Sequence, residues 1–270
     1  MISPQFQILC TATVALGLVL CPATHSRADA DKIKTSTKQN VGGIDRPGGT
    51  IRGTIKFAGK KVPRQPIQMQ GDKHCISQNV KTPALSERWV FGDNDTLQNV
   101  FVWVSKGLEG QKFTAPKTPA ILDQVNCIYR PHVSGIVARQ DLHIYNSDPS
   151  LHNVNVFPQF NGGFNEGMSA KGTKIVKQFN KPEIGIKFRC NVHPWMSAYV
   201  HVVSHPFFAV TQKEGTFEIK GLAPGVYTVK VWHEFSIFKP DKQEITVKIQ
   251  NTETKTVIFT YTPKKRKKSK

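Results

Sequence analysis

Acidic side chains are scarce in this 270-residue sequence. It has 19 aspartate and glutamate residues against 37 lysine and arginine residues, which gives a formal net charge of +18. So few carboxylates make calcium binding and acid hydrolysis poor candidates. Apolar residues make up 39% of the chain, too many for a disordered chain and too few for a bundle of membrane helices. The length allows two compact domains, so we expect a basic, turn-rich globular protein.

Several motifs of well-known chemistry are missing as well. The sequence has no Cys-x-x-Cys-His for haem attachment, no His-Glu-x-x-His for zinc hydrolysis and no Gly-x-Ser-x-Gly nucleophile turn. It also has no phosphate-binding glycine-rich loop. These absences predict that the chain alone is not an enzyme.

Long apolar runs are absent after the first thirty residues. The run from Ile8 to Cys21 carries no charge, and Ala28-Asp29-Ala30 follows it as a small-x-small cleavage site. A span of this length is shorter than the roughly 20 residues that a membrane helix needs. We therefore predict a cleaved export signal over residues 1–30, and a soluble mature protein in the periplasm or cell envelope.

The other end of the chain is strongly basic. Residues 263–270 form a tail in which six of the charges of the chain gather. Such a tail is either a solvated end or an electrostatic tether to anionic lipid, an anionic envelope polymer or an acidic partner. Nucleic acid is not an expected partner, because no basic motif interleaved with aromatic residues is present.

Alternation of apolar and polar residues recurs between the two ends. It is clearest over residues 51–57, 186–190, 227–231 and 245–249, and Gly and Pro separate these segments. No segment has the apolar stripe of an amphipathic helix. The pattern predicts an all-β protein built from a pair of β-sandwiches.

The segment from Cys190 to Met196 carries the most chemistry. It places a thiol, the imidazole of His193 and a thioether within seven residues, between two predicted strands. Upstream, His152 supplies a second imidazole. Two His, one Cys and a weak axial Met form a ligand set that suits copper in both of its oxidation states. Structural zinc favours a closed Cys/His tetrahedron instead.

This loop resembles that of the cupredoxins, the blue copper proteins, and its Cys-x-x-His-x-x-Met spacing is most similar to that of the amicyanins. The resemblance implies a Greek-key β-sandwich over residues 113–204 with one type 1 copper ion. It implies as metal ligands His152, Cys190, His193 and Met196. It also implies that the Asn153 side chain ties the two ligand loops together.

The same resemblance implies one-electron transfer through an exposed edge of His193. Pro194 and Trp195 would surround that edge and form a docking patch for a redox partner, and Trp195 could equally be a core anchor. A binuclear centre is excluded because the loop contains only one Cys. The trinuclear cluster of a multicopper oxidase is excluded because His-Cys-His and His-x-His are absent.

Three cysteines remain after removal of the signal. If Cys190 binds copper, Cys75 and Cys127 are left as a candidate disulfide in an oxidising compartment. Two alternatives stay open, namely a second metal site that uses His74 and His132, and a pair of free thiols.

The C-terminal third resembles the carboxypeptidase regulatory-like, transthyretin-type sandwiches, through the Pro224-Gly225 turn between two strands. We predict a discontinuous regulatory-like sandwich over residues 49–112 and 205–262, after a linker at 31–48. The cupredoxin would be inserted between its two parts. The alternative is one enlarged cupredoxin over residues 49–204 with a small β appendage.

Two functions follow from these patterns. The first is an exported electron-transfer protein whose basic charge favours an acidic redox partner. The second is a copper-binding or envelope-associated scaffold protein without a redox role, in which the second sandwich and the basic tail carry the function.

Overall fold

The computed structural model describes residues 47–264 of the chain. The predicted export signal, nearly all of the predicted linker and residues 265–270 of the basic tail lie outside the described residues. Within residues 47–264, no helix combines the length and the apolar content that crossing a membrane requires.

Strands dominate the described residues, and this confirms the predicted all-β class. The strands are β1 (Gly49–Phe57), β2 (Phe101–Lys106), β3 (Ala120–Val125), β4 (Ile128–Arg130), β5 (Val133–Val137), β6 (Leu142–Asn146), β7 (His152–Val156), β8 (Phe164–Met168), β9 (Lys174–Lys177), β10 (Glu183–Arg189), β11 (Ser197–Val203), β12 (Phe208–Val210), β13 (Thr216–Leu222), β14 (Gly225–Trp232), β15 (Phe238–Pro240), β16 (Glu244–Ile249) and β17 (Thr254–Pro263). The helical elements among the described residues are α2 (Lys73–Asn79) and the short 3-10 turn η1 (Asp93–Asp95).

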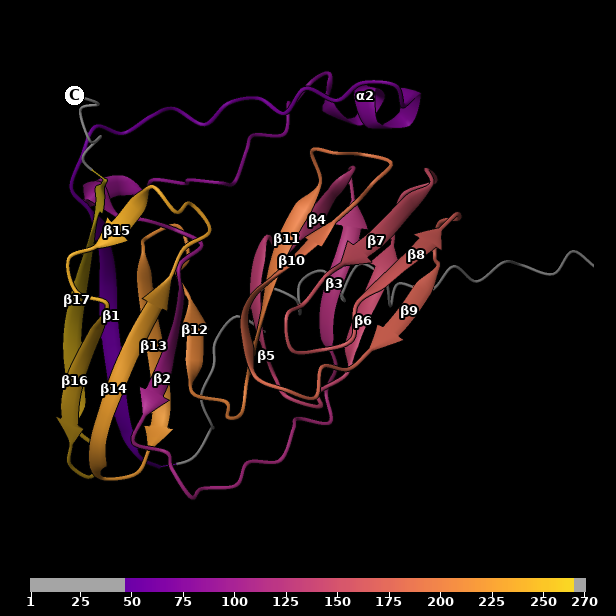
Figure 1. Ribbon diagram of the computed structural model, residues 1–270. Coiled ribbons are helices and arrows are strands. Elements are labelled where there is room, and N and C mark those ends of the chain that lie inside the picture. Colours follow the sequence, from indigo (N-terminus) through magenta and orange to yellow (C-terminus); the bar gives the residue numbers. More distant parts are fainter. Residues whose placement is uncertain (1–46, 265–270) are drawn as a thin grey trace, which may run out of the picture.

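Four sheets form two sandwiches that lie side by side (Figure 1). The central sandwich contains the sheets β5-β11-β10-β7-β8 and β4-β3-β6-β9, and the terminal sandwich contains the sheets β13-β1-β17-β15 and β12-β2-β14-β16. The terminal sandwich therefore takes strands from both ends of the described chain. Whether the two sandwiches are separate domains with boundaries after residues 112 and 204 stays a prediction.

The terminal sandwich is closed by β1, which pairs in parallel with β17 and antiparallel with β13. Ile51 and Ile55 of β1 are fully buried in its core, as the period-two pattern predicts. Between them, Gly53 leaves room for the ring of Phe217, because a Cβ at this position would lie 2.4 Å from two of its atoms. The glycine thus permits a close contact between the strands.

A third apolar cluster joins the two sandwiches. Its buried members are Phe101, Val133, Val137, Val203, Phe208 and Val210. Beside it, the buried His132 of the central sandwich forms an ion pair with the buried Glu234 of the terminal sandwich. Removing either partner would leave the other as an unpaired buried charge.

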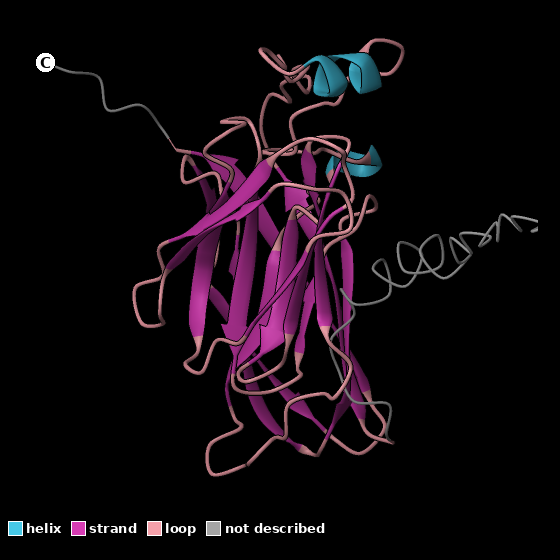
Figure 2. Cartoon of the chain, turned by 90° about the vertical axis from the view of Figure 1, so that its right-hand side faces the viewer, coloured by secondary structure: helices cyan, strands magenta, loops and turns pink. Residues whose placement is uncertain are grey.

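Residues 58–100, here called the cover segment, connect β1 to β2 by a long route over the central sandwich (Figure 1). The helix α2 of this segment lies beyond one end of the strands (Figure 2). The Asp72 side chain caps α2 by accepting a hydrogen bond from the Cys75 NH at 2.9 Å. Cys75 is buried in the core of the central sandwich and Met69 packs against that core.

This route corrects one sequence-based expectation. The whole of residues 49–112 was expected to build the regulatory-like sandwich, but α2 packs against the central sandwich instead. The sequence shows no helical stripe here because α2 has seven residues and buries only Cys75.

Candidate metal centre

The four candidate ligands lie at one end of the central sandwich. His152 begins β7, and Cys190 follows directly after β10. His193 lies in the β10–β11 loop, and Met196 is the last residue before β11. Because β10 pairs antiparallel with both β7 and β11, these chain positions meet at the same end of the three strands.

Three of these side chains converge on one point. The Nδ1 atoms of His152 and His193 lie 2.9 Å apart, and Cys190 Sγ lies 3.9 Å from His193 Nδ1. All three ligand atoms fall within 4.8 Å of one another, and all three residues are buried. Met196 is 1% exposed and belongs to the same apolar cluster as Cys190. The arrangement offers two borderline nitrogen donors and one soft sulfur donor to a single ion.

The short loop is held in shape by its own backbone. The Met196 NH donates to the His193 carbonyl at 2.9 Å, and the Cys190 NH donates to the Met196 carbonyl at 3.3 Å. These bonds fold the loop back on itself, so that the three side chains it carries keep fixed positions.

Backbone NH groups point at the Cys190 sulfur. Those of Asn153 and His193 lie 3.5 Å and 3.3 Å from Sγ. Burial raises the pKa of the Cys190 thiol, but hydrogen bonds from His152 and from these NH groups lower it more, and the pKa lies below its ordinary value. The thiolate, which is the form that binds a metal, is therefore favoured.

A carboxylate orients the first imidazole. His152 Nε2 lies 2.9 Å from Asp148 Oδ2, on the side of the ring away from Nδ1. Burial lowers the pKa of His152, but hydrogen bonds to Asp148 and Cys190, together with the charges of these two groups, outweigh burial and raise the pKa to about 9. A proton held on Nε2 leaves Nδ1 as the metal-binding atom.

Asn153 lies between the two ligand loops. Its Oδ1 accepts a hydrogen bond from the Asn191 NH at 2.5 Å, and its Nδ2 donates to Asn165 at 2.5 Å. The Asn191 side chain in turn accepts a hydrogen bond from Asn155 at 2.9 Å. These bonds connect β7 to the segment that follows β10.

The structure contradicts the expected exposed edge of His193. This residue is 2% exposed. Its Nε2 lies 3.5 Å from Asp72 Oδ2 and 3.7 Å from Cys75 Sγ, both in the cover segment. The edge that sequence reasoning assigned to electron transfer is therefore covered by α2 and the residue before it.

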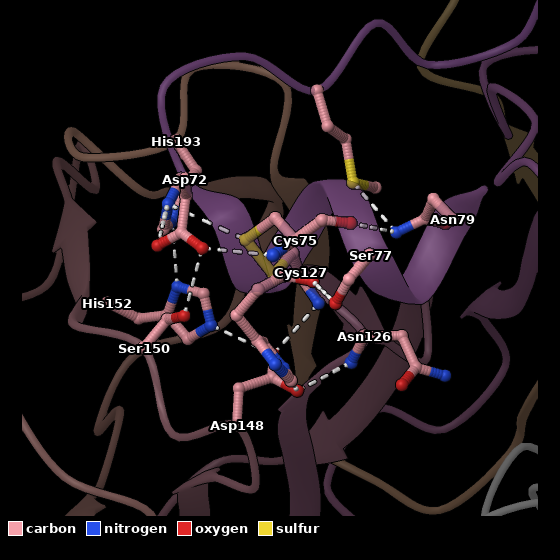
Figure 3. Close-up of a disulfide and its surroundings, with 12 residues drawn as sticks. Asp72, Cys75, Ser77, Asn79, Asn126, Cys127, Asp148, Ser150, His152 and His193 are labelled. Carbon is pink, nitrogen blue, oxygen red and sulfur yellow. Dashed lines mark hydrogen bonds and ion pairs between the residues drawn. A yellow bond between two sulfur atoms is a disulfide. The ribbon is translucent and has the colours of Figure 1, made fainter.

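Cys75 and Cys127 form a disulfide in the structure (Figure 3). It ties α2 to the turn between β3 and β4. Both half-cystines are fully buried. The disulfide excludes the alternative of two free thiols, and the second metal site that would use His74 and His132 does not form either. His132 instead pairs with Glu234, and His74 Nε2 lies 3.7 Å from Asp148 Oδ1.

The two residues of the expected docking patch differ in their surroundings. Pro194 is exposed, whereas Trp195 is half-buried. The Trp195 indole NH donates to the Cys127 carbonyl at 3.0 Å, and its ring centroid lies 4.9 Å from that of His193. Trp195 thus also packs against the disulfide turn.

Sequence reasoning missed the two carboxylates of the site. Asp148 lies four residues before His152, so a search for nearby partners of that imidazole would have found it. Asp72 lies 121 positions before His193, and no local pattern marks it.

No family model and no curated protein matches the chain. Similar solved structures include the Cu-containing nitrite reductase of Thermus scotoductus SA-01, with 18% identity and a TM-score of 0.30, over 37% of this chain and 25% of that one. The purple cupredoxin of Nitrosopumilus maritimus has 19% identity and a TM-score of 0.27, over 31% of this chain and 98% of that one. The amicyanin of Paracoccus versutus has 21% identity and a TM-score of 0.29, over 38% of this chain and 97% of that one. This chain thus spans a quarter of the reductase and nearly all of the other two, while more than half of it lies outside each match.

Proposed function

We propose that this chain is an exported protein that holds one type 1 copper ion and carries single electrons between redox partners. The proposal is carried by one observation: His152 Nδ1, Cys190 Sγ and His193 Nδ1 meet within 4.8 Å in a buried site. Met196 is buried in the same cluster and is the candidate for the weak fourth ligand.

The chemistry of the donors supports copper over zinc. A thioether is a soft ligand that suits Cu(I), and imidazole suits both oxidation states of copper. Structural zinc sites use four strong Cys and His ligands, and this site offers three. When bound, copper supplies a one-electron couple between Cu(II) and Cu(I).

The residues around the ligands would keep the site in one shape. Asp148 holds the His152 ring, and Asn153 ties the two ligand loops together. Backbone NH groups directed at the Cys190 sulfur stabilise negative charge there. A site that moves little suits a protein that gains and loses an electron without making or breaking other bonds, and we propose no enzymatic role for it.

The basic character of the chain supports an acidic redox partner. With a formal net charge of +18, association with such a partner is steered by long-range attraction. Pro194 and Trp195 remain our candidates for the contact, and the basic tail for a contact with an anionic envelope polymer or membrane surface. Electron-transfer rates that fall as ionic strength rises would support this part of the proposal, whereas rates independent of salt would refute it.

A second candidate function is favoured by the covered His193. A copper-binding or scaffold protein without a redox role has no need of an exposed ligand edge, and here that edge is 2% exposed. Voltammetry separates the two functions. A reversible one-electron wave supports electron transfer, and copper that cannot be cycled supports storage or scaffolding.

The first test is a visible absorption spectrum after addition of Cu(II) to the protein and to Cys190→Ala. An intense thiolate-to-copper band that ascorbate bleaches reversibly, and that Cys190→Ala lacks, is the expected result. Asn161→Ala serves as the control, because Asn161 contacts Glu183 at a distance from the ligands along β10. A wild-type protein that stays colourless, or that prefers zinc, would refute the type 1 site.

A further inference from the structure

Two carboxylates face the two metal-binding imidazoles from outside. Asp148 Oδ2 lies 2.9 Å from His152 Nε2, and Asp72 Oδ2 lies 3.5 Å from His193 Nε2. Each carboxylate is on the side of its ring opposite to Nδ1. A carboxylate in this position fixes the ring orientation and makes the imidazole a stronger donor.

The same disulfide holds both carboxylates. The Cys75 NH donates to Asp72 Oδ1 at 2.9 Å, and the Cys127 NH donates to Asp148 Oδ2 at 2.8 Å. Figure 3 shows the two aspartates on either side of the disulfide, with both imidazoles beside them. Ser150 Oγ, 3.2 Å from Asp72 Oδ1, adds a link between the cover segment and the β6–β7 loop. The disulfide therefore fixes the two backbone NH groups that hold Asp72 and Asp148 in place.

The disulfide also closes the site. Cys75 Sγ lies 3.7 Å from His193 Nε2, and α2 carries little else that is buried. A helix of seven residues with one buried side chain has little stability of its own. Besides Cys75, the helix contacts the central sandwich through His74, whose Nε2 lies 3.7 Å from Asp148 Oδ1.

From these observations we propose that the Cys75–Cys127 disulfide is a latch on the metal centre, and that Asp72 and Asp148 are positioning residues held by it. The inference rests on the proposed copper site. In the latched protein, α2 and Asp72 close the His193 side, so an ion or a reagent reaches the ligands only when the segment opens. Before the two thiols are joined the side is open, and the chain takes up its metal most readily in that state.

A purely structural disulfide makes a different prediction. It would stabilise the whole fold, so Cys190 would become accessible only through global unfolding, and its rate of reaction in a variant without the disulfide would rise with low concentrations of urea in parallel with global unfolding. Access to Cys190 therefore separates the two roles, and it can be measured without any metal.

The test uses copper-free full-length protein in which Cys10 and Cys21 are replaced by Ser. These two substitutions remove the other cysteines that lie outside the disulfide. Cys190 is the free thiol among the described residues, and it is 3% exposed. Its rate of reaction with Ellman's reagent is compared between this protein and the Cys75→Ser/Cys127→Ser variant, in which both backbone NH donors persist. Circular dichroism establishes that both proteins are folded.

We expect the thiol to react at least roughly tenfold faster without the latch, because the opening of α2 limits the reaction. Ser77→Ala is the control on α2. Ser77 is exposed and donates only to the His74 carbonyl, so its removal leaves the rate unchanged. Equal rates in the latched and unlatched proteins, or a faster rate that rises with urea in parallel with global unfolding, would overturn the proposal.

The positioning role is tested by Asp148→Asn in the copper-loaded protein. We expect the thiolate-to-copper band to persist and copper affinity to fall by roughly 10- to 100-fold, measured by competition with a chelator. Unchanged affinity would refute the positioning role. If the wild-type protein shows no such band, the proposed copper function fails, while the Ellman measurement still decides whether the latch exists.

Discussion

His201 provides a sharp test of how the two sandwiches are joined. It is fully buried, and its ring stacks on Phe101 with the ring centroids 4.0 Å apart and the planes 4° apart. Trp232 packs edge-on at 4.4 Å. His201 Nδ1 accepts a hydrogen bond from the Gly185 NH at 3.1 Å, and Nε2 is without a hydrogen-bond partner among the described residues. Burial lowers the pKa of His201 to about 3.

The lowered pKa makes stability depend on pH with a definite sign. In the unfolded chain this imidazole has a pKa of about 6.5. Below that pH the unfolded state binds a proton that the folded state does not, so the free energy of unfolding falls as pH falls. At about 1.4 kcal/mol per pH unit, the contribution of His201 between about pH 7.5 and pH 5 is a loss of about 2 kcal/mol. The loss continues until the pH approaches the folded pKa of about 3.

The assay is urea unfolding of wild type and His201→Phe at both pH values, followed by tryptophan fluorescence. Phenylalanine keeps the ring stack but leaves the Gly185 NH unpaired, so the variant is about 1–3 kcal/mol less stable at the higher pH. Between the two pH values, the gap between the proteins should shrink by about 2 kcal/mol. Because every other titrating group is common to both proteins, the change in the gap isolates His201. Parallel loss of stability in the two proteins would refute the reasoning.

Three further outcomes are expected. The Cys75→Ser/Cys127→Ser variant should lose about 4 kcal/mol of unfolding free energy in denaturant titrations, because the disulfide closes a loop with a sequence separation of 52; a loss below 1 kcal/mol would argue against this loop-entropy estimate. Glu183→Ala leaves two backbone NH groups without their acceptor, so limited proteolysis should cut the neighbouring loop faster than in wild type, and an unchanged pattern would count against the role of this carboxylate. Gly215→Ala should cost about 1–3 kcal/mol in thermal unfolding, since φ is +65° and a Cβ would lie 2.5 Å from a side-chain carbon. The matched change Gly162→Ala meets nothing within 4 Å and should be nearly neutral.

Local patterns predicted the strands well because each depends on neighbouring residues. The alternation around Ile51 and Ile55 reports which face of β1 is buried, and no distant contact is needed to see it. The candidate ligands were found for the same reason. Three of the four lie within seven residues, and the loop that carries them is bonded to itself.

The cover over the site could not be predicted in this way. Asp72 and Cys75 approach His193 from a segment more than a hundred residues earlier, and α2 is too short to show a period. The exposed edge of His193 was implied by the resemblance of the loop to a known family, whereas its burial depends on that distant segment. Counting cysteines pointed to the pair Cys75 and Cys127, but a count carries no information about what the bridge touches.

The position of β1 between β13 and β17 has a consequence for folding as the chain emerges, N-terminal end first. Strands β3 to β11 are consecutive in the sequence, so all the strands of the central sandwich are available once Val203 has emerged. β1 emerges first among the described strands, but its parallel neighbour β17 emerges last. Until then β1 has an unpaired edge, which is the kind of surface that pairs with other chains. The partly folded chain is therefore open to association at this edge until β17 pairs with β1.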